Sequence, residues 1–283
     1  MPGLAADIAV RHNAFSLPHL DEVVMRLGSV TRTAETIVDP HAYDNAIERG
    51  KPFFDDELHK FAPPKRFGYF PAIVANCGHP TPHILEVGTW IGASLAAWDR
   101  ASRGEAQFTV VDAWEPYAED SGEIYDFNRS VAANGSVYRL FMHNITALGM
   151  KDRVTIVRGD SRSVLPAMDG AFDIAFVDGD HRYEFVKSDI ENCKRLVKMG
   201  GILCGDDLEL QVADVDVGLA FINTEVGNKV DISAFQVDDA AGWEYFHPGV
   251  TRAVFDCFGR KVSCYDGLWV VRKAPGGWED VRL

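Results

Sequence analysis

The sequence predicts an α/β fold in which a mostly parallel sheet lies between two layers of helices. Five short apolar runs rich in Val and Ile follow one another from about residue 84, and each closes on a glycine or an acidic residue. Segments with helical spacing separate these runs, as in strand-helix-strand units. The runs show no polar alternation, so both faces of each strand are expected to be covered. A chain of 283 residues can bury the core of one such domain.

The elements can be assigned in chain order. The five predicted strands are HILEVG (83–88), FTVVDAW (108–114), VTIVRGD (154–160), FDIAFVDGD (172–180) and GILCGDD (201–207). A crossover helix before the fifth strand is indicated by the helical spacing of Val186, Ile190, Cys193 and Val197. AVFDCFG (253–259) predicts a further helix, and KVSCY (261–265) with LWVVRK (268–273) predicts an antiparallel hairpin at the sheet edge. The C-terminal APGGWEDVRL is expected to be a loose tail.

Three segments fall outside this alternation of strands and helices. Residues 1–80 contain helix-like pieces and many aromatic side chains but no evident core of their own, so we expect an N-terminal helical cap. Residues 115–136 and 208–248 leave the carboxyl ends of strands, where ligands bind in open α/β sheets, and are expected to be lids. The prediction is therefore a cap at 1–80 and an α/β domain at 81–283 that carries two insertions.

Composition and charge exclude several classes of function. With 28 Lys and Arg against 42 Asp and Glu, the formal net charge is −14, which argues against binding of a nucleic-acid backbone. Five scattered cysteines without a C-x-x-C pair indicate free thiols rather than a zinc site. The sequence shows neither an export signal nor a stretch apolar enough to span a membrane, so we expect a cytoplasmic protein without membrane contact.

The first candidate site is the turn after the first strand. Gly88 and Gly92 let a ligand approach the backbone at the start of a helix, where free N–H groups favour an anionic group. A dinucleotide site would need G-x-G-x-x-G, and here Thr89 and Trp90 stand in the crowded positions, so NAD binding is disfavoured. The alternative is a tight turn that holds no ligand.

Acidic residues end the next two strands. Asp112 follows Gly88 by 24 residues, close to the spacing at which an acid accepts the hydroxyls of a ribose. Asp160 and Ser161 could then bind an adenine amino group, and Trp90 or Trp114 could stack on the purine. Taken singly, each acid can also be a solvated strand end or a helix cap.

The strongest candidate site follows the fourth and fifth strands. Asp178 closes one strand and Asp206 and Asp207 close the next, with one helical crossover between them, so the three carboxylates should converge. Such a group needs a cation, and oxygen ligands suit Mg²⁺, Ca²⁺ or Mn²⁺. His181 is a candidate general base because it lies beside these acids and an imidazole can take up a proton near neutral pH. The alternatives are acids that cap loops and a histidine with a structural hydrogen bond.

In order and spacing, these motifs resemble class I S-adenosylmethionine-dependent methyltransferases over residues 80–273. The resemblance rests on EVGTWIGAS, VVDAW, YRLFMHNITALGMKDRVTIVRGDS, VDGDHRYEFVKSDI, GGILCGDD and HPGVTRAVFDCFG. It is closest to a metal-dependent subgroup that includes the macrocin and mycinamicin sugar O-methyltransferases. It implies a Rossmann-like sheet of seven strands with helices on both faces. The subgroup often has Glu where this chain has Asp206, and residues 1–80 contain no matching motif.

The resemblance also assigns roles to residues. It implies cofactor binding by Glu86, Gly88, Thr89, Gly92, Ser94, Asp112, Trp114, Asp160, Ser161 and Asp178. Glu86 and Gly88 would lie at the methionine moiety, Asp112 at the ribose, and Asp160 with Ser161 at the adenine. A divalent metal would be held by Asp178, Asp206 and Asp207. His181 and Asp178 would be catalytic, with His181 as the general base, and His247, Tyr183 and Tyr125 are alternative bases.

The expected function is transfer of a methyl group from S-adenosylmethionine to a hydroxyl of a small metabolite, assisted by Mg²⁺ or another hard divalent cation. A sugar or a glycosylated natural product, as in antibiotic biosynthesis, is the expected acceptor. By analogy with relatives, the protein is expected to form a homo-oligomer. Two alternatives stay open: methylation of an amine, and a cofactor-binding partner protein without turnover of its own.

Overall fold

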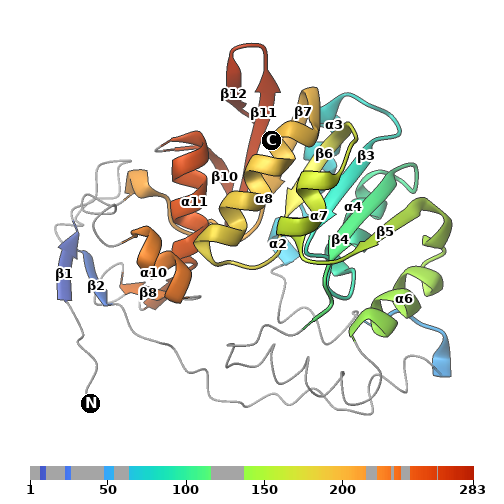
Figure 1. Cartoon of the computed structure of the whole chain (residues 1–283), viewed down its shortest axis with the longest axis horizontal. Coiled ribbons are helices and arrows are strands. Elements are labelled where there is room, and N and C mark those ends of the chain that lie inside the picture. The colour runs from blue at the N-terminus through green and yellow to red at the C-terminus, as the bar shows by residue number, and fades with distance from the viewer. Residues whose placement is uncertain are drawn as a thin grey trace.

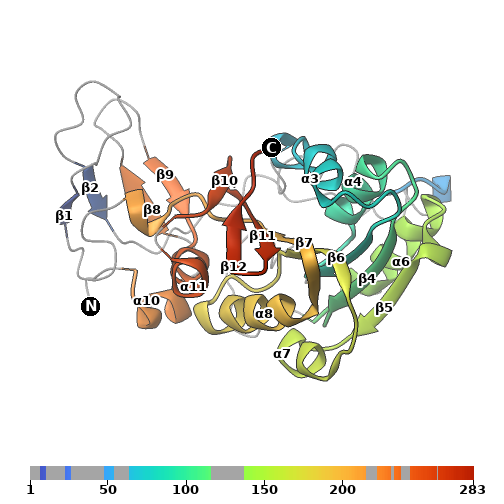
Figure 2. The ribbon, with the colours of Figure 1, turned by 90° about the horizontal axis from the view of Figure 1, so that it is seen from above.

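The computed structural model describes residues 7–10, 23–26, 48–53, 64–115, 137–214, 222–230, 233–236, 243–259 and 261–283. These segments contain a large sheet flanked by helices and a small antiparallel sheet beside it (Figures 1 and 2). The expected lid at 115–136 lies outside the described residues except for its first position, and Tyr125 lies outside them with it.

The large sheet has eight strands in the order β10-β11-β7-β6-β3-β4-β5, with β12 paired to β11. Its strands are β3 (His83–Val87), β4 (Gln107–Asp112), β5 (Val154–Arg158), β6 (Phe172–Val177), β7 (Val197–Gly205), β10 (Ser263–Tyr265), β11 (Leu268–Ala274) and β12 (Gly277–Asp280). The strands β3 to β7 pair in parallel, whereas β11 is antiparallel to β7, β10 and β12. The five predicted strands, the terminal hairpin and the open seven-stranded path are confirmed.

The C-terminal residues correct one expectation. They form a strand rather than a loose tail, because β12 folds back on β11 with Val271 opposite Asp280 and Ala274 opposite Gly277. Val281, just after β12, is 2% exposed. The apolar side chain at the end of the strand therefore belongs to the core.

Helices cover both faces of the large sheet, as predicted. The helices of the described segments are α2 (Pro64–Phe67), α3 (Phe70–Cys77), α4 (Ala93–Ala101), α6 (Val137–Ala147), α7 (Ser161–Val164), α8 (Tyr183–Leu196), α10 (Thr224–Lys229) and α11 (Pro248–Phe258). One core lies between the sheet and α3, α4 and α6, and the other lies between the sheet and α8 and α11. Ile84 belongs to the first core and its neighbour Leu85 to the second, because successive side chains of a strand point to opposite faces.

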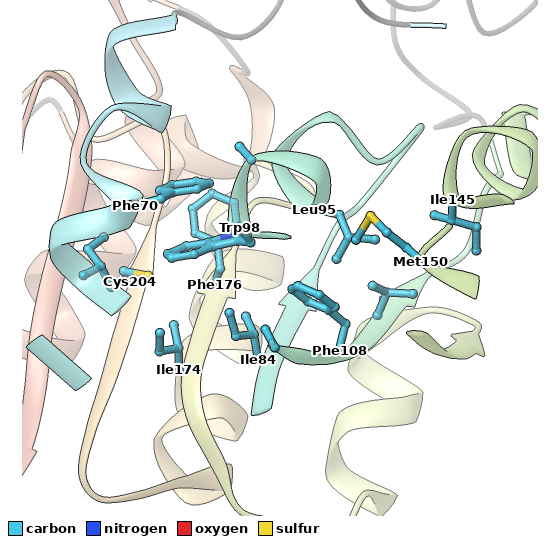
Figure 3. Close-up of a cluster of buried hydrophobic side chains, with 14 of the residues drawn as sticks. Phe70, Ile84, Leu95, Trp98, Phe108, Ile145, Met150, Ile174, Phe176 and Cys204 are labelled. Atoms are coloured by element: carbon cyan, nitrogen blue, oxygen red, sulfur yellow. The ribbon is translucent and has the colours of Figure 1, made fainter. Parts of the chain in front are cut away.

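The first core contains most of the largest fully buried side chains (Figure 3). Phe70 of α3 stacks on Trp98 of α4 with ring centroids 3.6 Å apart, and both rings meet the edge of Phe176 in β6. Residues 70–77 therefore pack in the same core as the strands that follow residue 80. All five cysteines are free, as predicted.

The predicted crossover helix is α8. Val186, Ile190 and Cys193 are buried in the second core, so the pattern that predicted the helix is confirmed. Val197 continues the same spacing but opens β7, because the chain turns extended after Leu196. Among the described helices, none combines the length and apolar character needed to cross a bilayer.

The N-terminal segment is only partly helical. Its described elements are the helices α2 and α3 and the strands β1 (Asp7–Val10) and β2 (Val23–Arg26). The two strands join β8 (Ser233–Gln236) and β9 (Trp243–Phe246), from the expected lid at 208–248, in an antiparallel sheet of order β1-β2-β8-β9. Four-residue strands carry too little pattern to be predicted, so this sheet is not expected from the sequence.

The parallel strands place the candidate site at one edge of the large sheet. From β3 the chain proceeds to β4 and β5 on one side and to β6 and β7 on the other, so the strand order reverses between β3 and β6. Ligands bind at such a switch point, outside the carboxyl ends of the strands. Asp178 donates its N–H to Val87 at 2.8 Å, and Asp206 donates its N–H to Val177 at 3.1 Å. The two acidic strand ends are thereby held beside the turn after β3.

Candidate functional site

The turn after β3 is shaped by Gly88, whose φ is +82°. A Cβ at this position would lie 2.1 Å from the carbonyl oxygen of Asp178, so β3 and the loop after β6 touch through their backbones. The crowding that requires glycine comes from Asp178 and not from a ligand. This contact brings the candidate metal ligand against the candidate cofactor turn.

We expect Gly88→Ala to destabilise the fold by roughly 2 to 5 kcal/mol, because left-handed strain and overpacking add together. Gly104→Ala is the matched control, since Gly104 has a φ of +77° and nothing within 4 Å of its would-be Cβ. The control should lose only the stability that the left-handed backbone conformation costs a non-glycine residue, about 1 to 2 kcal/mol. Urea denaturation of both variants gives the comparison, and equal losses would contradict the close-approach argument.

Glu86 and its neighbours offer unsatisfied polar atoms at the end of β3. Glu86 is fully buried, and its Oε1 accepts a hydrogen bond from Ser94 Oγ at 2.7 Å. Among the described residues, Glu86 Oε2 and Thr89 Oγ1 are buried without a hydrogen-bond partner. Burial raises the pKa of Glu86 to about 7, and the nearby hydroxyl groups offset part of the rise. Buried atoms of this kind fit a polar ligand such as the amino-acid end of S-adenosylmethionine.

Asp112 ties two turns together. Its Oδ2 accepts the N–H groups of Thr89 at 2.9 Å and Trp90 at 2.8 Å, and its Oδ1 accepts the N–H of Trp114 at 2.6 Å. Burial raises the pKa of Asp112 although these three donors favour the ionised form. Each carboxylate oxygen can accept more than one hydrogen bond, so ribose binding and this structural role are compatible.

Trp114 lies mostly inside the first core. It is 7% exposed, packs on Tyr138 and Phe141 with centroids 4.9 and 5.0 Å away, and donates its Nε1–H to the Trp90 carbonyl at 2.7 Å. Gly92, which caps α4, would place a Cβ 3.3 Å from the Phe141 ring. These contacts explain the two residues as parts of the fold, and their contact with the cofactor stays a prediction.

Asp160 caps a helix, which is the alternative left open by the sequence. Its carboxylate accepts the N–H of Arg162 at 2.9 Å and pairs with the guanidinium of the same residue. The side-chain hydrogen bond from Arg162 lowers the pKa of Asp160. Gly159 donates to the Asp112 carbonyl at 2.9 Å, so the two predicted nucleoside-binding acids lie on adjacent loops.

Asp189 of α8 is an unexpected buried acid behind this loop. It is 1% exposed and its Oδ1 has no hydrogen-bond partner among the described residues. Burial raises the pKa of Asp189 to about 7, and a hydrogen bond with Ser161 offsets part of the rise. Ser161 therefore contacts an acid that is largely protonated below neutral pH.

This pKa predicts a loss of stability as pH rises. Because the folded state binds a proton that the unfolded Asp189 releases near pH 4, stability falls from about pH 4 to pH 7. Asp189→Asn should remove this contribution. The free energy of unfolding of the variant, relative to that of wild type, should therefore rise by roughly 2 to 4 kcal/mol between pH 5 and pH 8. Chemical denaturation at both pH values measures it, and equal pH slopes in the two proteins would contradict the raised pKa.

The three predicted metal ligands are brought together, as expected. Ligand oxygens of Asp178, Asp206 and Asp207 all lie within 4.8 Å of one another. Burial, followed by the charges of Asp206 and Asp207, raises the pKa of Asp178 well above its ordinary value. Burial and then Asp207 raise the pKa of Asp206 to about 7. A divalent cation would relieve this repulsion, and three carboxylates are the donor set that suits a hard cation, so the residues fit the metal.

His181 lies against the same cluster. Its Nε2 is 3.0 Å from Asp207 Oδ2, and its ring centroid is 4.3 Å from that of His247. His247 Nδ1 lies 3.3 Å from Glu209 Oε2. Burial alone would raise the pKa of Asp207, but His247, His181 and Arg66 hold it well below its ordinary value. Tyr183 points elsewhere, since its hydroxyl binds Asp256 at 2.8 Å on the α8–α11 side.

Arg66 is a site residue that the sequence did not reveal. Its guanidinium donates to Asp206 at 2.6 Å, to Asp207 at 2.8 Å and to Glu209 at 2.6 Å, and it is 7% exposed. These carboxylates outweigh the effect of burial and raise the pKa of Arg66 further. Arg66 precedes its partners by 140 residues or more, so no local pattern signals the contact. Glu209 could have been identified from the sequence, because it continues the acidic run of Asp206 and Asp207.

Residues 85–208 match a family model described as a methyltransferase domain. The match spans the glycine turn, Asp112, Asp178 and the acidic pair, where the candidate-site motifs were identified. It covers less than half of the chain and shows similarity to a methyltransferase domain over that part. The chain has no significant match among curated proteins.

Several solved structures resemble the chain. The O-methyltransferase NovP is 16% identical with a TM-score of 0.48, over 74% of this chain and 80% of NovP. The methyltransferase PaMTH1 from Podospora anserina, bound to SAH, is 17% identical with a TM-score of 0.45, over 90% of this chain and 100% of PaMTH1. An O-methyltransferase family protein from Burkholderia thailandensis is 15% identical with a TM-score of 0.47, over 84% of this chain and 61% of that protein.

Proposed function

We propose that this protein is an S-adenosylmethionine-dependent methyltransferase that acts on a hydroxyl of a small metabolite with the help of a divalent cation such as Mg²⁺. The observation that carries the proposal is the convergence of Asp178, Asp206 and Asp207 with His181 at the switch point of the sheet. A sugar or glycosylated natural product is the acceptor class proposed, as in the macrocin and mycinamicin subgroup that the motifs resemble.

The proposed chemistry needs an oxygen nucleophile held in line and relieved of its proton. S-adenosylmethionine, when bound, supplies an electrophilic methyl group, and the cation, when bound, favours the ionised form of a nearby hydroxyl. Glu86 and Thr89 would bind the polar end of the cofactor, and Asp178, Asp206 and Asp207 would hold the cation.

His181 would take the proton from the acceptor. Its contact with Asp207 favours the tautomer whose proton is on Nε2, because that nitrogen then donates to the carboxylate. Nδ1 is then the basic nitrogen. Asp207 thus has two tasks in the proposal, since it orients the base and binds the cation.

Calorimetric titration tests the proposal before any acceptor is known. S-adenosylhomocysteine is titrated into chelator-treated protein with and without Mg²⁺, and micromolar binding in both conditions is expected. Absence of binding to folded protein would overturn the cofactor site. With an acceptor in hand, chelation should abolish turnover, whereas activity that survives chelation would indicate methylation of an amine, which needs no Lewis acid.

A further inference from the structure

Arg66 is held in the acidic cluster by contacts from two parts of the chain. Besides the three carboxylates after β7, its Nε–H donates to the Asp266 carbonyl at 2.7 Å in the turn between β10 and β11. Four hydrogen bonds to one buried guanidinium fix both its place and its orientation. The residue arrives from α2, in the segment that precedes the methyltransferase domain.

The hairpin turn between β10 and β11 packs closely on this guanidinium. A Cβ at Gly267 would lie 2.6 Å from Arg66 Nη2 and 2.8 Å from its Cζ. Asp266 has a φ of +52° and Gly267 a φ of +93°, as in the favoured two-residue Asp-Gly turn of a β-hairpin. The pairing of the two strands therefore fixes the turn, and the turn offers its carbonyl and a bare glycine to Arg66.

The charges around Arg66 exceed its own. Asp178, Asp206, Asp207 and Glu209 can carry four negative charges, and Arg66 supplies one positive charge on the side of Asp206, Asp207 and Glu209. Arg66 donates hydrogen bonds to one carboxylate oxygen of Asp206 and one of Asp207, and the other Asp207 oxygen faces His181. The guanidinium thus occupies a place where a second cation would otherwise find three carboxylates.

We propose that Arg66 is a positioning residue that acts as a resident cation. It fills the place between Asp206, Asp207 and Glu209, fixes the orientation of the first two carboxylates, and restricts divalent cations to the side of Asp178. The inference rests on the proposed function only for the ion on the Asp178 side. Independently of that function, the inference states that Arg66 excludes one divalent ion from the cluster.

The test counts bound Mn²⁺ by electron paramagnetic resonance on chelator-treated full-length protein, without cofactor or acceptor. Arg66→Met and Arg66→Gln remove the charge, and each should bind one Mn²⁺ more per chain than wild type. Arg66→Lys restores a positive charge and should return the count to the wild-type value. Arg153→Met is the matched control, because Arg153 pairs with Asp99 at 2.5 Å next to the opposite end of the sheet and should leave the count unchanged.

The outcomes separate this inference from the proposed function. A wild-type protein that binds no Mn²⁺ would refute the cation site of the proposed function, but an Arg66→Met variant that then binds one ion would still support the role of Arg66. An unchanged count in folded Arg66→Met or Arg66→Gln overturns the inference. If both variants unfold while Arg153→Met remains folded, the role of Arg66 is purely structural and the inference is likewise overturned.

Discussion

Replacing His181 with alanine is expected to lower kcat by about 10² to 10⁴, the usual contribution of a general base. The imidazole contacts Asp207 and lies beside the candidate cation ligands, so its loss removes the proton acceptor and leaves the cofactor turn intact. Affinity for S-adenosylhomocysteine should therefore stay within a few fold of wild type. Steady-state kinetics and calorimetry measure the two quantities separately.

His247→Ala is the comparison that assigns the base. His247 packs against His181 and contacts Glu209, but its Nδ1 lies 3.9 Å from the nearer Asp207 oxygen. Its replacement should therefore cost much less in kcat than that of His181. If His181→Ala keeps the acid limb of the wild-type pH profile, His181 is not the base. If His247→Ala is the more damaging change, the assignment passes to His247.

Replacing Asp178 with asparagine should lower the Mg²⁺-dependent rate by about 10² or more, because Lewis-acid assistance is worth several kcal/mol. The fold should tolerate the change. The pKa of Asp178 is raised by burial and by its acidic neighbours, so a neutral side chain of the same shape suits the metal-free protein.

The stability of the protein provides a second readout for Asp178. Wild type should gain about 2.7 kcal/mol when Mg²⁺ reaches a hundred times its Kd, and Asp178→Asn should gain almost nothing. Asp180→Asn is the matched control, since Asp180 binds Arg182 two residues along and lies outside the cluster. A full response to Mg²⁺ in Asp178→Asn would contradict the assignment of this residue as a ligand.

Much of this edge could be predicted because parallel strands impose strong local patterns. Apolar runs that end on Gly88, Asp112, Asp178 and Asp206 identify the strands and their carboxyl ends at once. Since all parallel strands end at the same edge, the sequence order of the acids predicts their proximity. The convergence of the three carboxylates needed nothing more.

What could not be predicted depends on contacts between distant segments. Arg66 meets acids 140 to 143 residues away, and no spacing rule links them. Asp160 could not be assigned either, because helix caps and ligand-binding acids have the same residue type at the same place. The strands β1 and β2 were missed because four residues show too little periodicity.

The contact between Arg66 and the β10–β11 turn also bears on the order in which the chain folds. The carbonyl that Arg66 Nε–H binds belongs to a residue 200 positions later. Phe70 of α3 likewise contacts Phe176 of β6, which follows it by more than 100 residues. Contacts this far apart form late, because closing a long loop costs entropy before the contact rewards it. During synthesis from the N-terminus, α2 and α3 leave the ribosome long before β6 and the β10–β11 turn. The acidic edge is therefore expected to be among the last parts of the molecule to form, and a nascent chain that stops before the hairpin lacks the complete site.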